Sequence, residues 1–302
     1  MKKQIILVLF AFISIGAIAQ QRLCVRDSLT QEPIAYTSVW FGNDAGGYTD
    51  ESGMIEIPEG TKPMRLSHIC YETKNIDKTT ADSQTIFLVP KSNTLDEVAV
   101  SAKPPKRIKT TEVGLVKAKT QTKHKGANGF EMALFIPYDS TWTETPYIHS
   151  ILASLDYSTH YLVFTEIKTP IYATLRFDLR LPDAMTGAPR DESLMDGGII
   201  LPSGQKLGKD GVSLTCPIPF PQTGVFVVVE WITTAQISES FNLVPSLNMT
   251  LNEKENRTWN KKKFRGMDWM KEQNEPAYQN EEAQVFYKGR TPSAKLGLRI
   301  SK

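Results

Sequence analysis

Residues 175–181, LRFDLRL, alternate strictly between apolar and charged side chains. Successive side chains of a β-strand point to opposite faces of the sheet, so residues 173–181 are predicted to form a half-buried strand. Residues 225–231, VFVVVEW, are apolar apart from Glu230. Such a run is typical of a strand that is covered on both faces, and residues 225–232 are predicted to form one. The two stretches together predict that the C-terminal part of the chain is built on a β-sheet.

Further strand candidates lie before and after these two. They are dense in apolar, β-branched and aromatic residues, and breaks rich in proline or glycine separate several of them. The candidates are residues 130–136, 148–155, 161–164 and 296–300. We therefore predict that residues 112–302 form a jelly-roll-like β-sandwich, which is the larger part of an all-β protein.

The N-terminal part contains shorter strand candidates at close spacing, without helical periodicity. The clearest are residues 34–41, 64–71 and 85–89, and residues 43–47 form one predicted turn. In a second turn, Asp50 can accept hydrogen bonds from backbone N–H groups and Gly53 can adopt a positive φ. Short strands joined by such turns predict a small sandwich over residues 20–100.

Length and charge limit the possible functions. A chain of 302 residues exceeds the size at which single cores stop growing, roughly 250 residues, so two domains are expected. The 35 Lys and Arg residues nearly balance the 33 Asp and Glu residues, which gives no electrostatic basis for binding nucleic acid. Residues 101–111 are basic and contain two prolines, so they are predicted to form an extended linker.

The first 19 residues are typical of an export signal. Lys2 and Lys3 precede an apolar run over residues 5–15, and Ala17-Ile18-Ala19 has the small-x-small pattern of a cleavage site. The alternative, a membrane anchor, needs about 20 apolar residues, and this run is shorter. We therefore predict a signal peptide over residues 1–19 and an exported protein without a transmembrane helix.

Several motifs in the N-terminal part occur in the order of a known module. They are Val25-x-Asp27, Thr30-x-Glu32-Pro33-Ile34, Thr49-Asp50-x-x-Gly53, Leu66-Ser67-His68-Ile69, Tyr71-Glu72-Thr73 and Leu95-Asp96-Glu97-Val98. This stretch resembles the carboxypeptidase regulatory-like domain, in the form found at the start of SusC-type TonB-dependent receptors. Cys70 departs from the pattern, which usually has glycine there. The resemblance implies a seven-stranded prealbumin- or immunoglobulin-like sandwich, located in the periplasm or at the outer membrane of a Gram-negative bacterium.

The resemblance implies no enzyme, because it covers the accessory domain of carboxypeptidases and not their catalytic domain. A zinc carboxypeptidase needs a His-x-x-Glu pair, and none of the four histidines has glutamate at that spacing. The chain has no Gly-x-Ser-x-Gly elbow and no phosphate-binding loop. We therefore predict no catalytic residue, no metal and no cofactor. The second domain is similar to the second half of secreted two-domain proteins that begin with a regulatory-like domain.

Two glutamates on predicted strands allow a sharper hypothesis. Glu131 and Glu230 could form the carboxylate pair of a glycosidase. In the alternative, which we favour, one glutamate at the end of a sheet is structural, and it is hydrogen-bonded or paired with Arg176 or Arg180. Aromatic residues could instead provide platforms on which a sugar ring stacks, or they could belong to the core. The candidates are Trp142, Trp259 and Trp269, with Tyr138 and Tyr147.

The basic run 261–265 and the cysteines each leave alternatives open. The run lies between two tryptophans, and in an exported protein it is predicted to be a solvated loop or to contact an anionic glycan or lipid. Cys24 and Cys70 fall in the same predicted domain and could form a disulfide in an oxidising compartment, with Cys216 unpaired. Alternatively, all three cysteines are small buried apolar residues.

These observations favour a non-enzymatic accessory protein of the cell envelope. Its regulatory-like domain would brace or dock, and its second sandwich would bind a glycan or an envelope protein. One alternative is a structural partner of an outer-membrane complex that binds by strand addition at a sheet edge. A third hypothesis, a glycan hydrolase, requires an acidic cleft that contains Glu131 or Glu230.

Overall fold

The computed structural model describes residues 21–42, 45–76, 84–91, 109–158, 171–195, 197–234, 243–251, 256–272 and 290–301. The predicted signal peptide, residues 95–100, most of the linker and the strand candidate at 161–164 lie outside them. Every described element is a strand, apart from the short 3₁₀ helix η1, Lys263–Arg265. The prediction of an all-β protein is confirmed.

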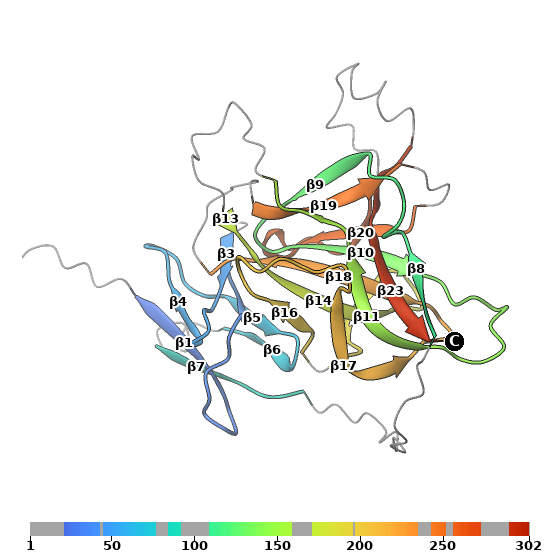
Figure 1. Ribbon diagram of the computed structural model, residues 1–302. Helices are drawn as coiled ribbons and strands as arrows, with labels where there is room; N and C mark the ends of the chain where they lie inside the picture. Colours follow the sequence, from blue (N-terminus) through green and yellow to red (C-terminus); the bar gives the residue numbers. More distant parts are fainter. Residues whose placement is uncertain are drawn as a thin grey trace, which may run out of the picture.

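The first seven strands form a small two-sheet sandwich, drawn in blue to cyan in Figure 1. One sheet has the order β4 (Met54–Glu56), β1 (Arg22–Asp27), β7 (Thr85–Leu88). The other has the order β3 (Ala45–Tyr48), β2 (Ser38–Gly42), β5 (Arg65–His68), β6 (Tyr71–Asn75). Leu23, Val25, Val39, Leu66 and Ile86 fill the core with at most 1% of their surface exposed. The predicted seven-stranded sandwich is confirmed.

The turn before β4 has the predicted chemistry. Asp50 Oδ1 accepts hydrogen bonds from the backbone N–H groups of Ser52 and Met54, at 2.8 and 2.9 Å. Gly53 has a φ of 71°, and a Cβ there would lie 2.6 Å from the carbonyl oxygen of Val25. Glycine is required here both by the backbone conformation and by this close approach.

The second sandwich is built on a seven-stranded sheet, which we call the large sheet. Its order is β15 (Pro189–Ser193), β14 (Thr174–Pro182), β18 (Val225–Ile232), β10 (Phe130–Ile136), β20 (Thr258–Lys262), β21 (Met270–Lys271), and β16 (Ile199–Leu201) also pairs with β14. A four-stranded sheet has the order β17 (Val212–Pro219), β11 (Tyr147–Ala153), β23 (Leu296–Ser301), β8 (Thr110–Gly114). The inward side chains of both sheets share one core, which confirms the predicted larger β-sandwich.

A third, smaller sheet was not expected from the sequence. Its central strand β19 (Leu243–Thr250) pairs with β12 (Leu155–Asp156), β13 (Ile171–Tyr172), β22 (Ser293–Ala294) and β9 (Thr122–Gly126). Most of its strands are two residues long, too short for a periodic pattern to be recognised. Of the longer strands, β8, β10, β11, β14, β17 and β18 alternate between the large and the four-stranded sheet, as strands do in jelly-roll-like folds.

The prediction that β14 is half-buried is wrong. Arg176, Asp178 and Arg180 point away from the core, yet at most 5% of each residue is exposed. The outer face of the large sheet is covered here by the first sandwich, which lies beside the second sandwich in Figure 1, and by the chain around η1. Covering a charged face requires ion pairs, and these pairs define the site described below.

Two predictions in the first sandwich also need correction. Residues 64–71 were expected to form one strand, but they divide into β5 and the start of β6, with a turn at 69–70. Residues 45–47, expected in a turn, belong to β3. Gly46 faces Phe264 of the second sandwich, and a Cβ on this glycine would lie 2.1 Å from the ring. Gly46 therefore serves close packing between the two sandwiches, which local turn rules do not anticipate.

Candidate functional site between the two sandwiches

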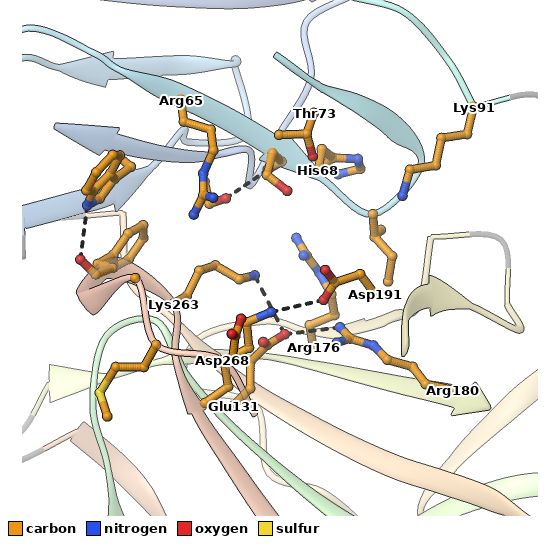
Figure 2. Close-up of a pocket in the computed structure, with 18 residues that line it drawn as sticks. Arg65, His68, Thr73, Lys91, Glu131, Arg176, Arg180, Asp191, Lys263 and Asp268 are labelled. Atoms are coloured by element: carbon orange, nitrogen blue, oxygen red, sulfur yellow. Dashed lines mark hydrogen bonds and ion pairs between the residues drawn. The ribbon is translucent and has the colours of Figure 1, made fainter. Parts of the chain in front are cut away.

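A cavity of about 210 Å³ lies where the first sandwich meets the outer face of the large sheet. Strands β2, β5 and β6 of the first sandwich form one wall, and β10, β14, β15 and β20 form the other. Figure 2 shows Arg65 and Lys91 on one side of this space and Arg176, Asp191 and Lys263 on the other. The residues that follow η1, including Asp268, complete the lining.

A row of charged residues crosses the large sheet on the cavity side. Arg176, Glu230, Glu131 and Lys261 are direct neighbours on four adjacent strands, β14, β18, β10 and β20. Directly opposed side chains in antiparallel strands lie about 5 Å apart at their Cβ atoms. The order of charges is positive, negative, negative, positive, so each carboxylate has a cation on its outer side.

Glu230 is the most heavily bonded member of this row. Its Oε1 accepts a hydrogen bond from the Tyr48 hydroxyl at 2.7 Å and forms an ion pair with Lys263. Its Oε2 forms an ion pair with Arg176 Nη1 at 3.2 Å. Burial alone would raise the pKa of this carboxyl, but Lys263 and Arg176 outweigh that effect and lower the pKa to about 2. Glu230 is therefore ionised throughout the neutral range. The Tyr48 hydroxyl stays protonated, because burial and Glu230 raise its pKa well above 10.0.

Glu131 and Asp178 are bound by Arg180. Arg180 Nη2 lies 3.0 Å from Glu131 Oε1, and Arg180 Nε lies 2.8 Å from Asp178 Oδ2. Asp178 also accepts a hydrogen bond from the Ser193 hydroxyl. Arg180, Glu131 and Asp178 are each at most 5% exposed. Buried ion pairs of this kind restrict the side chains on this face of the sheet to one arrangement.

Arg176 connects the two sandwiches and has one unused donor. Its Nη2 donates to the backbone carbonyl of Tyr36 in the first sandwich at 3.1 Å, while its Nη1 binds Glu230. Within the described part of the chain, Arg176 Nε is buried without a hydrogen-bond partner. Only 4% of Arg176 is exposed, and the residue lines the cavity. A buried, charged donor without a partner is costly, so an additional acceptor close to Arg176 would be favourable.

Two further cations of the cavity have no carboxylate partner among the described residues. Arg65 of β5 lies with its guanidinium 5.6 Å from the ring centre of Trp40, and Lys91 follows β7. Lys261, in contrast, pairs with Asp191 at 2.9 Å. The lining as a whole has six Arg and Lys side chains against three Asp and Glu. Arg176, Arg180, Lys261 and Lys263 are paired with carboxylates, so the excess positive charge of the cavity comes from Arg65 and Lys91, on the side of the first sandwich.

The cations near the cavity also affect the pKa of His68. His68 lies at the end of β5 and lines the cavity. Burial, together with the positive charges of Arg176 and Lys263, lowers the pKa of His68 to about 3. His68 Nδ1 accepts a hydrogen bond from the backbone N–H of Cys70 at 3.2 Å. The imidazole is therefore neutral at physiological pH and adds no charge to the cavity.

The structure brings some of the sequence-predicted site residues together and separates others. Glu131 and Glu230 are neighbours and bind Arg180 and Arg176, as the structural alternative expected. Lys261 and Lys263, expected in a solvated loop, are half-buried and take part in ion pairs.

The predicted aromatic candidates do not form a single platform. Trp259 and Trp269 lie half-buried on the outer face of the large sheet, where Lys271 and Arg180 approach their rings to 5.5 and 5.7 Å. Trp142 lies elsewhere, packed edge-on against Phe220 and Tyr138 at the margin of the core. Tyr147 is 45% exposed on β11. None of these five residues lines the cavity.

The possible disulfide between Cys24 and Cys70 is not formed. Cys24 is buried in β1, whereas Cys70 lies in the turn between β5 and β6 of the other sheet, and neither of them nor the exposed Cys216 is in a disulfide. Cys70 faces the second sandwich, since its Sγ lies 3.0 Å from the position of a Cβ on Gly197. Among the residues that the structure describes, no three His, Cys, Asp or Glu side chains are grouped as metal ligands.

No sequence pattern predicts the contribution of the first sandwich to this site. Tyr48 and Glu230 are 182 residues apart in the chain, and Arg65 and Lys91 look like ordinary surface cations in sequence. A possible signal was the charged face of β14, because a strand with three buried charges needs a covering partner.

No known protein family, curated protein or solved structure matches this chain. In the described residues, no helix has the length and apolar character needed to cross a membrane.

Proposed function

We propose that this protein is a non-enzymatic binding protein of the cell envelope, and that the cavity between its two sandwiches binds a small anionic ligand. The observation that carries the proposal is Arg176, which lines the cavity and whose buried Nε has no hydrogen-bond partner among the described residues. An anionic oxygen is the strongest acceptor for such a donor. The unpaired cations Arg65 and Lys91 of the opposite wall favour the same ligand charge.

The regulatory-like first sandwich has a clear role in this proposal. It contributes Arg65, His68 and Lys91 to the cavity, and Tyr48 and Tyr36 bind the charged row of the large sheet. It would therefore brace the second sandwich and complete the binding site. Export to the envelope rests on the signal-peptide pattern of residues 1–19.

A glycan hydrolase is a weaker proposal for the same place. A glycosidase needs one carboxyl group that stays protonated to act as the general acid. Glu230 is ionised, with a pKa of about 2 caused by Lys263 and Arg176 acting against burial, and Glu131 is bound by Arg180. Both carboxylates are 1% exposed, which leaves little room for a scissile bond between them.

A thermal-shift experiment with anions tests the proposal. Inorganic phosphate, citrate and galacturonate are compared at constant ionic strength, because salt screens exposed charges. A ligand at a hundred times its Kd should stabilise the protein by ~2.7 kcal/mol and raise the Tm by several degrees. The shift should shrink in Arg65→Gln and Lys91→Gln.

Lys271→Gln is the matched control, since Lys271 lies over the Trp259 ring and outside the cavity. Its shift should equal that of the unmodified protein. Equal shifts in all three variants would show that the anion binds elsewhere, and the absence of any shift with every anion would refute the proposed function.

A further inference from the structure

We infer that the ligand of this cavity is an acidic sugar, meaning a single hydroxylated ring that carries a carboxylate or a phosphate group. The inference rests on the proposed function and specifies its ligand class. It combines the positive groups of the cavity with a carboxylate and hydroxyl groups that an inorganic anion would not use.

The anionic group of the ligand is assigned to the space between the two walls. Arg176 Nε is buried and unbonded in one wall, and Arg65 and Lys91 extend from the other, as Figure 2 shows. An oxygen that accepts from a guanidinium forms a charge-assisted hydrogen bond, roughly twice as strong as a neutral one. These contacts alone do not distinguish a carboxylate from a phosphate.

The rest of the lining is suited to ligand hydroxyl groups. Asp268 lines the cavity, is exposed, and has no ion pair or hydrogen bond to another described residue. Ser67 and Thr73 add hydroxyl groups on the opposite wall. An ionised Asp accepts hydrogen bonds only, so it binds a hydroxyl donor and repels a plain anion. A hydroxylated ring with a negative group can contact both Asp268 and the cations.

The size and charge of the cavity exclude other ligand classes. Pockets for drug-sized molecules have about 300–1,000 Å³, and the 210 Å³ here lies below that range, which favours a ligand of one ring over a nucleotide or a long glycan. A zwitterion such as an amino acid would also carry a donor for Asp268. Its ammonium group, however, would share the cavity with Arg65 and Lys91, which have no carboxylate partner among the described residues, and this is unfavourable.

Isothermal titration calorimetry of the whole protein with matched ligands tests the inference. Galacturonate and glucose-6-phosphate carry both groups, galactose lacks the charge, and acetate and inorganic phosphate lack the hydroxylated ring. Either galacturonate or glucose-6-phosphate, or both, should bind more tightly, by about tenfold or more, than galactose, acetate and inorganic phosphate. The ratio between the two sugar acids distinguishes a carboxylate from a phosphate ligand.

The variant Asp268→Asn separates this inference from the proposed function. It should weaken sugar-acid binding by about tenfold and leave phosphate or acetate binding unchanged or stronger, because a repulsive charge is removed. Glu59→Gln, which changes an exposed carboxylate outside the cavity, is the control and should leave every affinity unchanged.

Three outcomes would overturn the inference. Equal binding of plain anions and sugar acids, with no effect of Asp268→Asn, would refute the sugar and leave the proposed anion site intact. Tighter binding of glutamate or alanine than of either sugar acid would identify a zwitterion site. No binding by any anion would refute both the inference and the proposed function.

Discussion

At the scale of single residues, Glu230 is the group on which the junction of the two sandwiches depends. It accepts from Tyr48 of the first sandwich and from Arg176 and Lys263 of the second. Replacement of Glu230 by Gln leaves the buried Arg176 without a carboxylate partner, and leaves the half-buried Lys263 with only Glu131, at 3.7 Å. We expect Glu230→Gln to lower the free energy of unfolding at pH 7 by about 3–5 kcal/mol, measured by urea denaturation.

The control for this variant is Glu56→Gln. Glu56 pairs with Arg22 at 3.2 Å, with side chains 46% and 64% exposed, and exposed pairs of this kind contribute at most about 1 kcal/mol. A loss in Glu230→Gln as small as that in Glu56→Gln would show that the buried pairs do not hold the junction.

His68 gives the protein a defined dependence of stability on pH. Its pKa is about 3 in the folded protein, because burial and the cations Arg176, Lys263 and Lys91 outweigh Glu230, and the ordinary value is about 6.5. Between these values the unfolded chain binds a proton at this position that the folded protein does not bind. Stability contributed by the neutral imidazole is therefore complete above pH 6.5 and is lost as the pH falls toward 3.

The variant His68→Gln removes the side chain that binds this proton in the unfolded chain. Between pH 4 and pH 6, the slope of the unfolding free energy against pH should be smaller in the variant by about 1.4 kcal/mol per pH unit. Above pH 7 the slopes of the two proteins should coincide. Parallel curves over the whole range would mean that His68 titrates normally in the folded protein.

At the scale of elements, β3 and η1 determine how closely the two sandwiches pack. Phe264 of η1 lies between Gly46 of β3 and Gly129, and a Cβ on either glycine would approach its ring to 2.1 or 2.5 Å. Because the ring is blocked on both sides, it cannot move away from an added methyl group. We expect Gly46→Ala to lower the free energy of unfolding by about 1–3 kcal/mol in urea denaturation.

Gly208→Ala is the matched control for this packing. No atom lies within 4 Å of a Cβ at Gly208, and its φ lies outside the left-handed region. The change should be within about 0.5 kcal/mol. Similar effects at Gly46 and Gly208 would argue against close contact between β3 and η1.

The elements also show how far the sequence alone could go. Residues 130–136 and 225–232 were predicted as strands with the bounds of β10 and β18, because long apolar runs between breaks are strong signals. The two-residue strands β12, β13 and β22 of the third sheet have no such signal in the sequence. The ion pairs of Glu131 and Glu230 with Arg180 and Arg176 were anticipated as one alternative. Burial on both faces of β14 was not, since it comes from a different domain.

At the scale of the whole molecule, the site exists only because the two sandwiches meet. Trp40 Nε1 donates to the carbonyl of Phe264 at 3.1 Å, and Tyr48, Ile232 and Phe264 form a small apolar cluster at the junction. The linker predicted at 101–111 suggested two separate domains, and sequence patterns contain no information about how such domains pack. The cations of one wall and the unbonded Arg176 donor of the other become a single site through this packing.

The most direct test is a crystal of the whole protein soaked in selenate, whose selenium is located by anomalous diffraction. Selenate is a tetrahedral oxyanion of the charge that the cavity is proposed to accept. The expected result is an anomalous peak inside the cavity, with selenate oxygens within hydrogen-bond distance of Arg176 Nε and near Arg65 or Lys91. Peaks confined to the outer surface, with the cavity free of selenium and Arg176 Nε bound to another protein group, would contradict an anion site between the two sandwiches.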